Sequence, residues 1–371
     1  MNVDVLVVGA GFSGTVIAER LANAGRNVLV IDKRQHIGGN AYDTYDDNGI
    51  LVHKYGPHSF HTKIDRVWNY LSQFTDWRSF ELRVLAEVEG KMVPVPFNLD
   101  SLHALFPADY ASKIESLLTK QYGVNSAIPI LQLRSSEDKE LRVLSEYIYE
   151  NIFYHYTKKQ WGVGPEELDQ SVTARVPVYI SRDDRYFQDK YQAMPSKGYT
   201  RLFAQMLDHP NIKLDLGVDF MQLKSSVRAE HIVYTGRVDE YYDFCYGKLP
   251  YRSITLNWEH IPTQVQFQPV AIVNYPNNHD YTRITEFKHM TGQEHPGTTV
   301  VREYPMADGE PYYPVPNPQN AELYKQYEKL AIAEQNVTFV GRLAEYRYYN
   351  MDQAIDSALT KADSILGLTH K

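Results

Sequence analysis

The stretch VDVLVVGAGFSG, residues 3–14, decides the fold, because a β-branched run ends there in a glycine-rich turn. A helical pattern follows and is closed by Gly25. Its apolar residues fall on one face and are Val16, Ile17, Leu21 and Ala24. A second apolar run, residues 28–31, ends at Asp32. Strand, glycine turn, helix, strand and acid, in this order, predict the opening of a Rossmann-type unit.

Each glycine of this turn has a mechanical purpose in a dinucleotide site. Gly9 permits the tight turn, Gly11 lets a pyrophosphate approach the backbone, and Gly14 lets the helix pack close to the strand. The pyrophosphate then meets the helix N-terminus, where free N–H groups and the helix dipole favour negative charge. Asp32 ends the second strand, where a carboxylate can accept hydrogen bonds from ribose hydroxyls. We therefore predict a bound dinucleotide rather than a glycine turn of some other α/β protein.

The composition is that of an ordinary globular protein with about two or three domains. Of its 371 residues, 43% are hydrophobic and 23% are charged. The 38 basic and 46 acidic residues give a net charge of −8, which argues against a nucleic-acid surface. An anionic substrate would therefore need a locally positive pocket. The 29 tyrosines could help such a pocket to stack a base and hold phosphates.

The cysteine content indicates a reducing compartment, and the apolar runs argue against a membrane span. Cys245 is the only cysteine, so neither an intramolecular disulfide nor a cysteine zinc cluster is possible. The apolar run at residues 3–8 is too short for a membrane span, and no basic leader precedes it. We therefore expect a cytoplasmic protein with no membrane span.

Hydrophobic periodicity divides the rest of the chain into helices and strands. Helices are expected over residues 63–74, 107–122, 138–156, 199–207, 322–333 and 352–366. Strands are expected over residues 212–216, 232–234 and 337–340, and as a hairpin of 82–88 and 91–95 that turns at Glu89-Gly90. Residues 251–258, 265–274 and 298–303 have strand character without helices between them, which indicates an antiparallel sheet. Residues 162–195 are rich in Pro, Arg and Asp and predict loops.

The dinucleotide is predicted to be FAD. Asp32 would suit FAD or NAD, but Gly38-Gly39-Asn40 resembles the second motif of the glutathione-reductase-like FAD family. A late strand that ends at Gly341-Arg342 and leads into a helix at Asp352 also fits that family. We expect an α/β fold with a discontinuous Rossmann-like FAD-binding domain, an inserted helical domain, and a mainly antiparallel sheet that binds substrate. The expected limits of the FAD-binding domain are 1–78, 190–240 and 318–371, and those of the helical domain are 96–160. The sheet domain is expected over 79–95, 161–189 and 241–317, and the family resemblance given next implies that its loop near 165–180 is mobile.

Several motifs, in one order, resemble those of bacterial UDP-galactopyranose mutases. In the first half of the chain they are Tyr55-Gly56-Pro57-His58-Ser59-Phe60-His61, Lys159-Gln160-Trp161-Gly162, Arg182-Asp183-Asp184-Arg185-Tyr186-Phe187 and Met194-Pro195-Ser196-Lys197-Gly198-Tyr199-Thr200. Later come Tyr234-Thr235-Gly236, Tyr251-Arg252-Ser253, Tyr281-Thr282-Arg283-Ile284-Thr285-Glu286-Phe287-Lys288-His289 and Gly341-Arg342-Leu343. The resemblance implies a homodimer that interconverts UDP-galactopyranose and UDP-galactofuranose with reduced FAD and no net redox change.

The resemblance also implies which residues bind the nucleotide sugar. Arg175 and Arg283 would bracket the diphosphate and act in catalysis, with Arg175 on the mobile loop. Without the family motifs, such arginines would more often form surface salt bridges. The other implied substrate residues are Phe153, Tyr156, Trp161, Tyr186, Asn274, Glu303, Tyr313 and Tyr348. As isolated aromatic residues, most of them would more often serve in packing.

The resemblance also implies a flavin site around the glycine turn. Its residues are Gly9, Gly11, Phe12, Ser13, Gly14, Asp32, Lys33, Gly39, Asn40, Tyr55, Gly56, His58, His61, Gly341, Arg342, Asn350, Met351 and Asp352. His61 is also expected to act in catalysis. His58 and His61 could be taken for metal ligands, but no third ligand has sensible spacing, so no metal is expected. Two departures from the family are Asn350, where many relatives carry aspartate, and Arg237-Val238.

The chemistry implied by the resemblance does not need a nucleophilic side chain. Cys245 lies outside the motifs, and no serine–histidine pair stands out. In the family, N5 of reduced FAD attacks the anomeric carbon while arginines hold UDP, and the ring recloses through the 4-hydroxyl. An FAD domain alone leaves two alternatives open. One is a flavin oxidoreductase of the amine-oxidase type, and the other is a non-catalytic nucleotide-sugar binder.

Overall fold

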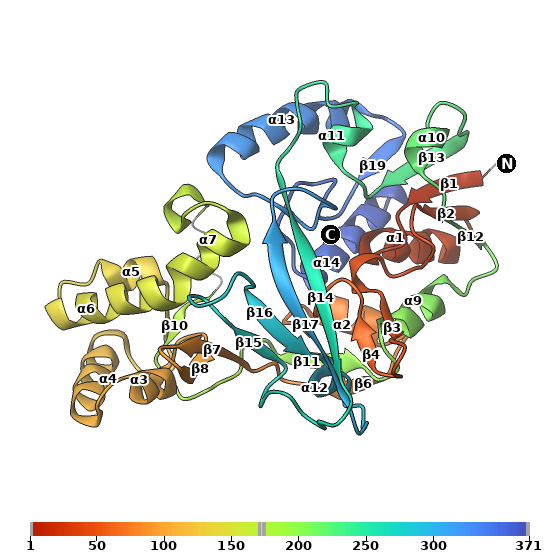
Figure 1. The fold of residues 1–371 in the computed structure, drawn as a ribbon. Helices are drawn as coiled ribbons and strands as arrows, with labels where there is room; N and C mark the ends of the chain where they lie inside the picture. Colours follow the sequence, from red (N-terminus) through yellow and green to blue (C-terminus); the bar gives the residue numbers. More distant parts are fainter. Residues whose placement is uncertain (1–2, 170–171, 173–175, 369–371) are drawn as a thin grey trace.

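A parallel sheet carries the glycine turn in the computed structural model, which describes residues 3–169, 172 and 176–368 (Figure 1). The sheet has five strands in the order β12-β2-β1-β13-β19, and every neighbouring pair is parallel. They are β1 (Val3–Val8), β2 (Val28–Asp32), β12 (Ile212–Leu216), β13 (Ala229–Tyr234) and β19 (Val337–Phe339). The predicted Rossmann-type unit is confirmed, and its strands come from distant parts of the chain.

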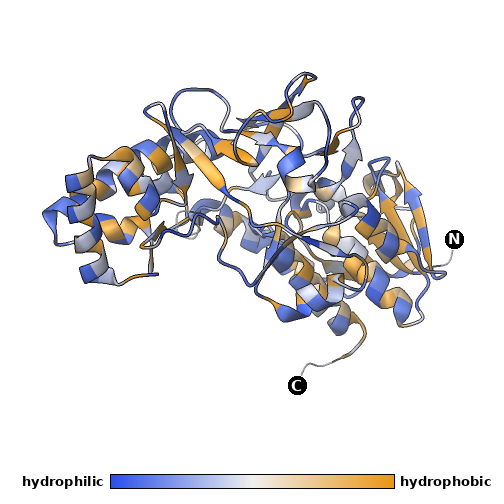
Figure 2. Cartoon of the chain, turned by 90° about the horizontal axis from the view of Figure 1, so that it is seen from below, coloured by the Kyte–Doolittle hydropathy of each residue, from blue (hydrophilic) through white to orange (hydrophobic). Residues whose placement is uncertain are grey.

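The helix that follows the glycine turn, α1 (Phe12–Asn23), lies at the centre of this unit. Its apolar face is fully buried, and it packs against α14 (Met351–Ile365) and α9 (Tyr199–Leu207). Figure 2 shows hydrophobic colouring along the strands near the N-terminus. The other helices of this part are α10 (Phe220–Leu223), α11 (Val238–Tyr241) and α13 (Pro318–Ala333). The expected helices over 199–207, 322–333 and 352–366 are therefore present.

The second large sheet is mainly antiparallel, as expected. Its seven strands lie in the order β18-β14-β17-β16-β15-β7-β8, and the pair β7 and β15 is parallel. They are β7 (Val84–Val88), β8 (Lys91–Val95), β14 (Tyr251–Ile261), β15 (Ile272–Asn274), β16 (Arg283–Glu286), β17 (Thr298–Met306) and β18 (Tyr313–Pro314). The hairpin of β7 and β8 turns at Glu89-Gly90, and both residues have positive φ.

Shorter strands and helices connect the two sheets. One antiparallel sheet joins β5 (Phe60–Thr62), β11 (Tyr191–Pro195) and β6 (Trp77–Ser79). Other elements here are η1 (Gly39–Ala41), β3 (Asp43–Tyr45), β4 (Leu51–His53), α2 (Asp65–Leu71) and α12 (Phe287–Thr291). Residues 162–195, expected as loops, hold β11 as well as η3 (Pro165–Glu167) and β10 (Val178–Tyr179), which pairs with β9 (Ala127–Ile128).

A group of helices lies apart from the parallel sheet in Figure 1. It contains α3 (Leu99–Leu105), α4 (Ala108–Tyr122), α5 (Ile130–Arg134) and α6 (Lys139–Ile148). The single helix expected over 138–156 is longer and changes pitch. It passes from α6 through the π-helix η2 (Tyr149–Tyr154) into α7 (His155–Trp161). In the described part of the chain, no helix has the length and apolar character that a membrane crossing requires.

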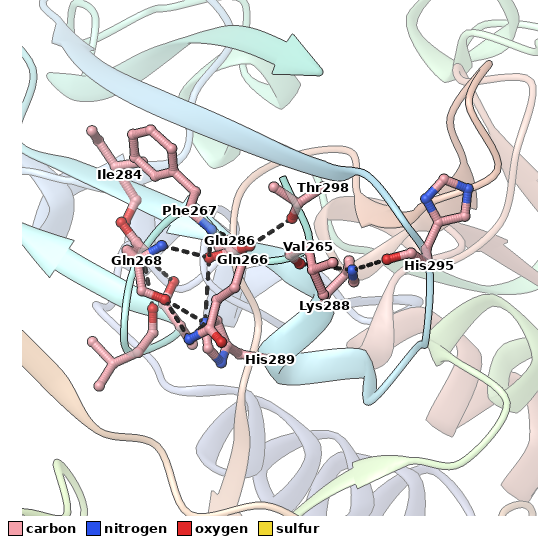
Figure 3. A network of polar contacts seen from close by, with 12 residues as sticks. Val265, Gln266, Phe267, Gln268, Ile284, Glu286, Lys288, His289, His295 and Thr298 are labelled. Atoms are coloured by element: carbon pink, nitrogen blue, oxygen red, sulfur yellow. Dashed lines mark hydrogen bonds and ion pairs between the residues drawn. The ribbon is translucent and has the colours of Figure 1, made fainter. Parts of the chain in front are cut away.

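The prediction of a strand over residues 265–274 is wrong, because only β15, at the end of this range, is a strand. Figure 3 shows the cause, a polar network around the buried carboxylate of Glu286. This carboxylate accepts the backbone N–H groups of Phe267 and Gln268, at 3.0 Å each, and the hydroxyl of Thr298. Lys288 Nζ donates to the carbonyl oxygens of Val265, His295 and Gly297. These side chains replace the ladder hydrogen bonds that a strand would need.

Candidate active site

Two glycine turns face each other at the edge of the parallel sheet. A Cβ on Gly14 would lie 1.9 Å from the carbonyl oxygen of Gly9, so the close approach of α1 to β1 requires glycine. Gly39, with φ +55°, would bring a Cβ to 2.9 Å from Cα of Gly11. The backbone of one turn therefore forms one wall of a cradle, and the backbone of the other turn forms the opposite wall.

The cradle opens into a cavity of about 750 Å³. That volume is in the range of cofactor sites. Of the predicted flavin residues, those that line it are Gly9, Gly11, Phe12, Ser13, Gly14, Asp32, Lys33, Gly39, Asn40, His58, Gly341, Arg342, Asn350 and Met351. The helix α1 begins at the cavity without a side-chain cap, so its first N–H groups are available to an anion. The residues fit the FAD that the sequence predicts.

Asp32 is fixed in place at the end of β2. Its Oδ2 accepts the backbone N–H of Ala10 at 2.8 Å, and its Oδ1 accepts that of Arg34 at 2.8 Å. These two bonds orient the carboxylate at the cavity wall, where further lone pairs can accept hydroxyl donors. The expected contact with a ribose is therefore sterically possible.

Four predicted flavin residues do not line the cavity. Tyr55 stacks under the guanidinium of Arg34, at 4.0 Å. Gly56 faces Glu303, Asp352 accepts a hydrogen bond from Thr62 at 2.9 Å, and His61 lies in β5. Nδ1 of His61 pairs with Asp189, and its ring stacks on Phe187 with centroids 3.4 Å apart. The flavin and catalytic roles of His61 stay predictions, since its ring is engaged on the side of β11.

Sequence reasoning missed several lining residues. Among them are Arg34, Gly38 and three segments, residues 218–221, 234–237 and 309–312. Arg34 Nη2 donates to Glu310 Oε1 at 2.7 Å, so the loop before β18 is tied across the cavity to the loop after β2. The motif Tyr234-Thr235-Gly236 was a usable signal, because it follows a strand parallel to β1. The segments at 218–221 and 309–312 carry no comparable signal.

A row of polar side chains crosses the second sheet beside this cavity. Asn274, Arg283 and Glu303 are directly paired on β15, β16 and β17, so all point to the same face. Nε of Arg283 lies 2.8 Å from Oε1 of Glu303, and the Glu303 side chain is only 1% exposed. Burial lowers the pKa of Arg283, but the Glu303 carboxylate raises it more, so the pKa ends well above its usual value. Arg283 is a permanent cation there.

Several acceptors in this row have no hydrogen bond within the described residues. They are Oδ1 of Asn274 and both carboxylate oxygens of Glu303, and Nε of Arg283 is also unbonded, because its approach to Glu303 lacks hydrogen-bond geometry. Buried polar atoms without partners are costly, and their presence indicates a site that a ligand completes. The ligand must bring several donors.

Aromatic side chains surround this row. The rings of Trp161, Tyr313 and Tyr348 contact one another, with centroids 5.2 to 6.3 Å apart. Arg342 lies over the Tyr313 ring, at 5.0 Å, and so links this cluster to the cavity. Burial raises the pKa of Tyr156 and of Tyr313, so both phenols stay protonated and can donate.

The remaining predicted substrate residues divide into three cases. Tyr186 lies near Tyr156 and helps to raise the pKa of the Tyr156 phenol, after burial, and its role in substrate binding stays a prediction. Phe153 is buried in η2, among core residues. Arg175 lies outside the described residues.

His58 stands between the row and the cavity. Burial lowers its pKa to about 3, and the nearby charges of Arg342 and Arg283 act in the same direction. Its Nδ1 lies 2.8 Å from the carbonyl oxygen of Gly56, which fixes the ring. In the described ranges, no cluster of His, Cys, Asp and Glu side chains could hold a metal.

Comparisons with known proteins agree with this geometry. Residues 151–348 match the UDP-galactopyranose mutase family model, and residues 7–74 match a NAD(P)-binding Rossmann-like domain. A Klebsiella pneumoniae protein described as a probable UDP-galactopyranose mutase is 41% identical over 98% of this chain and 95% of its own length. A dTDP-fucopyranose mutase of Escherichia coli is 37% identical over 96% of each chain. A crystal structure of reduced UDP-galactopyranose mutase superposes with a TM-score of 0.75 at 16% identity, over 100% of this chain and 96% of that one. The chain therefore belongs to the UDP-galactopyranose mutase family.

Proposed function

We propose that the protein is an isomerase that interconverts UDP-galactopyranose and UDP-galactofuranose without net oxidation or reduction. One observation carries the proposal. A permanently charged, largely buried arginine and several unpaired acceptors lie directly beside a cavity that fits FAD.

The side chains of the row have separate tasks. Arg283 holds the diphosphate and stabilises the charge of departing UDP, because a guanidinium can bond two oxygens at once. Tyr156 and Tyr313 donate to phosphate oxygens as neutral phenols. Trp161, 5% exposed, supplies a flat apolar wall for the nucleotide. Reduced FAD, when bound, supplies the nucleophile that no described side chain offers.

The sugar is proposed to bind over Asn274 and Glu303. Galactose carries a 6-hydroxyl, whereas fucose has a methyl group there and so offers one donor fewer. A site with buried acceptors rejects an analogue that leaves one of them unpaired. Because Oδ1 of Asn274 and Oε2 of Glu303 have neither a hydrogen bond nor an ion pair in the described residues, we favour UDP-galactose over the dTDP-fucopyranose named for one relative.

One assay separates the candidate functions. The purified yellow protein is incubated with UDP-galactofuranose, with and without dithionite, and the products are separated by chromatography. We expect UDP-galactopyranose only in the reduced sample. Consumption of an electron acceptor together with the sugar would favour the oxidoreductase alternative, and UDP binding without conversion would favour the non-catalytic binder. A parallel incubation with dTDP-fucopyranose tests the sugar, and faster conversion of that substrate would contradict our choice.

Further features are proposed from the sequence and the family resemblance. They are a cytoplasmic homodimer without nucleic-acid partners, the domain limits given above, a loop near 165–180 that brings Arg175 to the diphosphate, and the catalytic role of His61. Light scattering on the eluted protein tests the dimer, and the mass of a single chain would contradict it. Arg175→Ala tests the loop, since it should weaken UDP binding while leaving FAD in place.

A further inference from the structure

The helix α7 carries two of the proposed substrate residues, Tyr156 and Trp161, and follows directly from the π-helix η2. It is short and ends at Gly162, whose φ of +75° stops the helix. The last carbonyl groups of any helix need partners from outside it. The orientation of Tyr156 and Trp161 therefore depends on what holds this end.

Arg252 of β14 binds the C-terminal end of α7. This arginine belongs to the motif Tyr251-Arg252-Ser253, which the proposed function does not use. Its Nε donates to the carbonyl oxygen of Gln160 at 3.0 Å, and its Nη2 donates to that of Lys159 at 3.3 Å. A Cβ on Gly162 would lie 3.0 Å from Nη1 of Arg252, so the missing side chain lets the guanidinium approach. In Figure 1, α7 lies on the side of the second sheet where β17 runs next to β14.

The charge of Arg252 suits this place. In the described parts of the chain, the Arg252 guanidinium donates to the carbonyl oxygens of Gln160 and Lys159, and burial lowers its pKa. The C-terminal end of a helix carries partial negative charge and favours a cation. The guanidinium therefore finds its main partners in the two helix carbonyls.

The same arginine is tied to the aromatic cluster from the other side. Arg252 pairs across strands with Tyr313, and its carbonyl oxygen accepts the backbone N–H of Tyr312 at 2.9 Å. Leu256, four residues further along β14, pairs with Glu303, so Arg252 is on the face that carries the polar row. One side chain thus connects the helix of Trp161 to the strand of Tyr313.

We infer that Arg252 is a positioning residue that sets the end of α7, and through it the place of Trp161 against Tyr313, for binding of a nucleoside diphosphate. This inference deepens the proposed function and rests on it for the identity of the ligand. Arg252 acts through Trp161 and need not touch the ligand.

The test measures UDP binding by calorimetry on the oxidised protein, which requires no turnover. Arg252→Met keeps the aliphatic part of the side chain but removes the donors, and we expect the Kd for UDP to rise about ten-fold, because a displaced Trp161 loses its aromatic contact with the nucleotide. Arg252→Lys should recover part of the loss, because one ammonium can still bond a carbonyl. KM for the nucleotide sugar should rise more than kcat falls, with FAD content unchanged. Arg302→Met is the matched control, since Arg302 lies on the opposite face of β17 and pairs with the exposed Glu259.

A double-mutant cycle shows whether the effect passes through Trp161. In a Trp161→Phe background, Arg252→Met should weaken UDP binding much less than in the wild type. Equal effects in both backgrounds, or wild-type UDP affinity in Arg252→Met, would overturn the inference. If Arg252→Met does not fold, Arg252→Lys tests the same contact alone, because one ammonium cannot replace both hydrogen bonds and UDP should still bind less tightly than in the wild type. Failure of the wild-type protein to bind UDP would instead refute the proposed function.

Discussion

The pairing of Arg283 with Glu303 allows a quantitative prediction. Arg283→Met leaves the Glu303 carboxylate buried, at 1% exposure, without its cation. Removing one partner of a buried pair costs about 3–5 kcal/mol of the free energy of unfolding. Because the Arg283 side chain is 22% exposed, we expect the lower end of that range, about 3 kcal/mol.

The second substitution separates stability from catalysis. Arg283→Met combined with Glu303→Gln removes both charges, so the free energy of unfolding should return to within about 1 kcal/mol of the wild type. Turnover should not return. Loss of one electrostatic stabiliser of a departing group costs about a hundred- to a thousand-fold in kcat. FAD should remain bound in both variants, because neither residue lines the cofactor cavity.

Urea unfolding followed by circular dichroism gives the stabilities, chromatography after dithionite reduction gives turnover, and flavin absorbance gives occupancy. Arg302→Met is the control, since its partner Glu259 is 47% exposed and the pair should contribute less than about 1 kcal/mol. A double variant as unstable as Arg283→Met would refute the electrostatic account of stability. Near-normal turnover in Arg283→Met would refute its role at the diphosphate, and loss of the yellow colour would make it a cofactor residue.

Three further predictions concern the cofactor and pH. Gly14→Ala places a Cβ 1.9 Å from a backbone oxygen, so the protein should purify without yellow colour, and normal FAD content would contradict the close packing of α1. Glu310→Gln weakens the tie to Arg34 across the cavity, so FAD should dissociate faster in stopped-flow fluorescence, and added salt should accelerate release in the wild type more than in the variant. Burial lowers the pKa of His289, but its hydrogen bond to Glu286 raises it more, to a net value above 6.5. The resulting stabilisation is complete below pH 6.5 and is lost as pH rises through the folded-state pKa of His289. His289→Gln should therefore lower the melting temperature at pH 6 and change it little at pH 9. Equal decreases in melting temperature at both pH values would contradict the ion pair.

The sequence predicted best where one local pattern decides the structure. The unit of β1, α1 and β2 follows from its β-branched runs and glycine spacing, and α9 and β12 have the predicted limits. The bounds of β16 could not be predicted, because Arg-Ile-Thr-Glu is short and polar, and only the expectation that Arg283 lies at a strand is confirmed. Its strand character comes from pairing with β15 and β17, which no local window contains.

For the candidate site too, the residues that local sequence patterns fix could be predicted, and those that depend on the topology could not. The glycine motif and Asp32 were visible because a turn and a strand end fix them locally. The lining at residues 218–221 and 309–312 depends on which loops the topology brings to the edge of the parallel sheet. The break of the expected helix at η2 depends on a change in hydrogen-bond register that residue propensities do not report.

The order of strands in the parallel sheet also bears on how the protein is made. The first forty residues contain most of the cofactor cradle, yet their neighbour β13 ends at Tyr234, and the edge strand β19 begins only at Val337. The ribosome must therefore deliver almost the entire polypeptide before α14 can cover α1. Until then the nascent chain exposes an apolar helix face that a chaperone could hold, and flavin capture is expected to be among the last events of biogenesis.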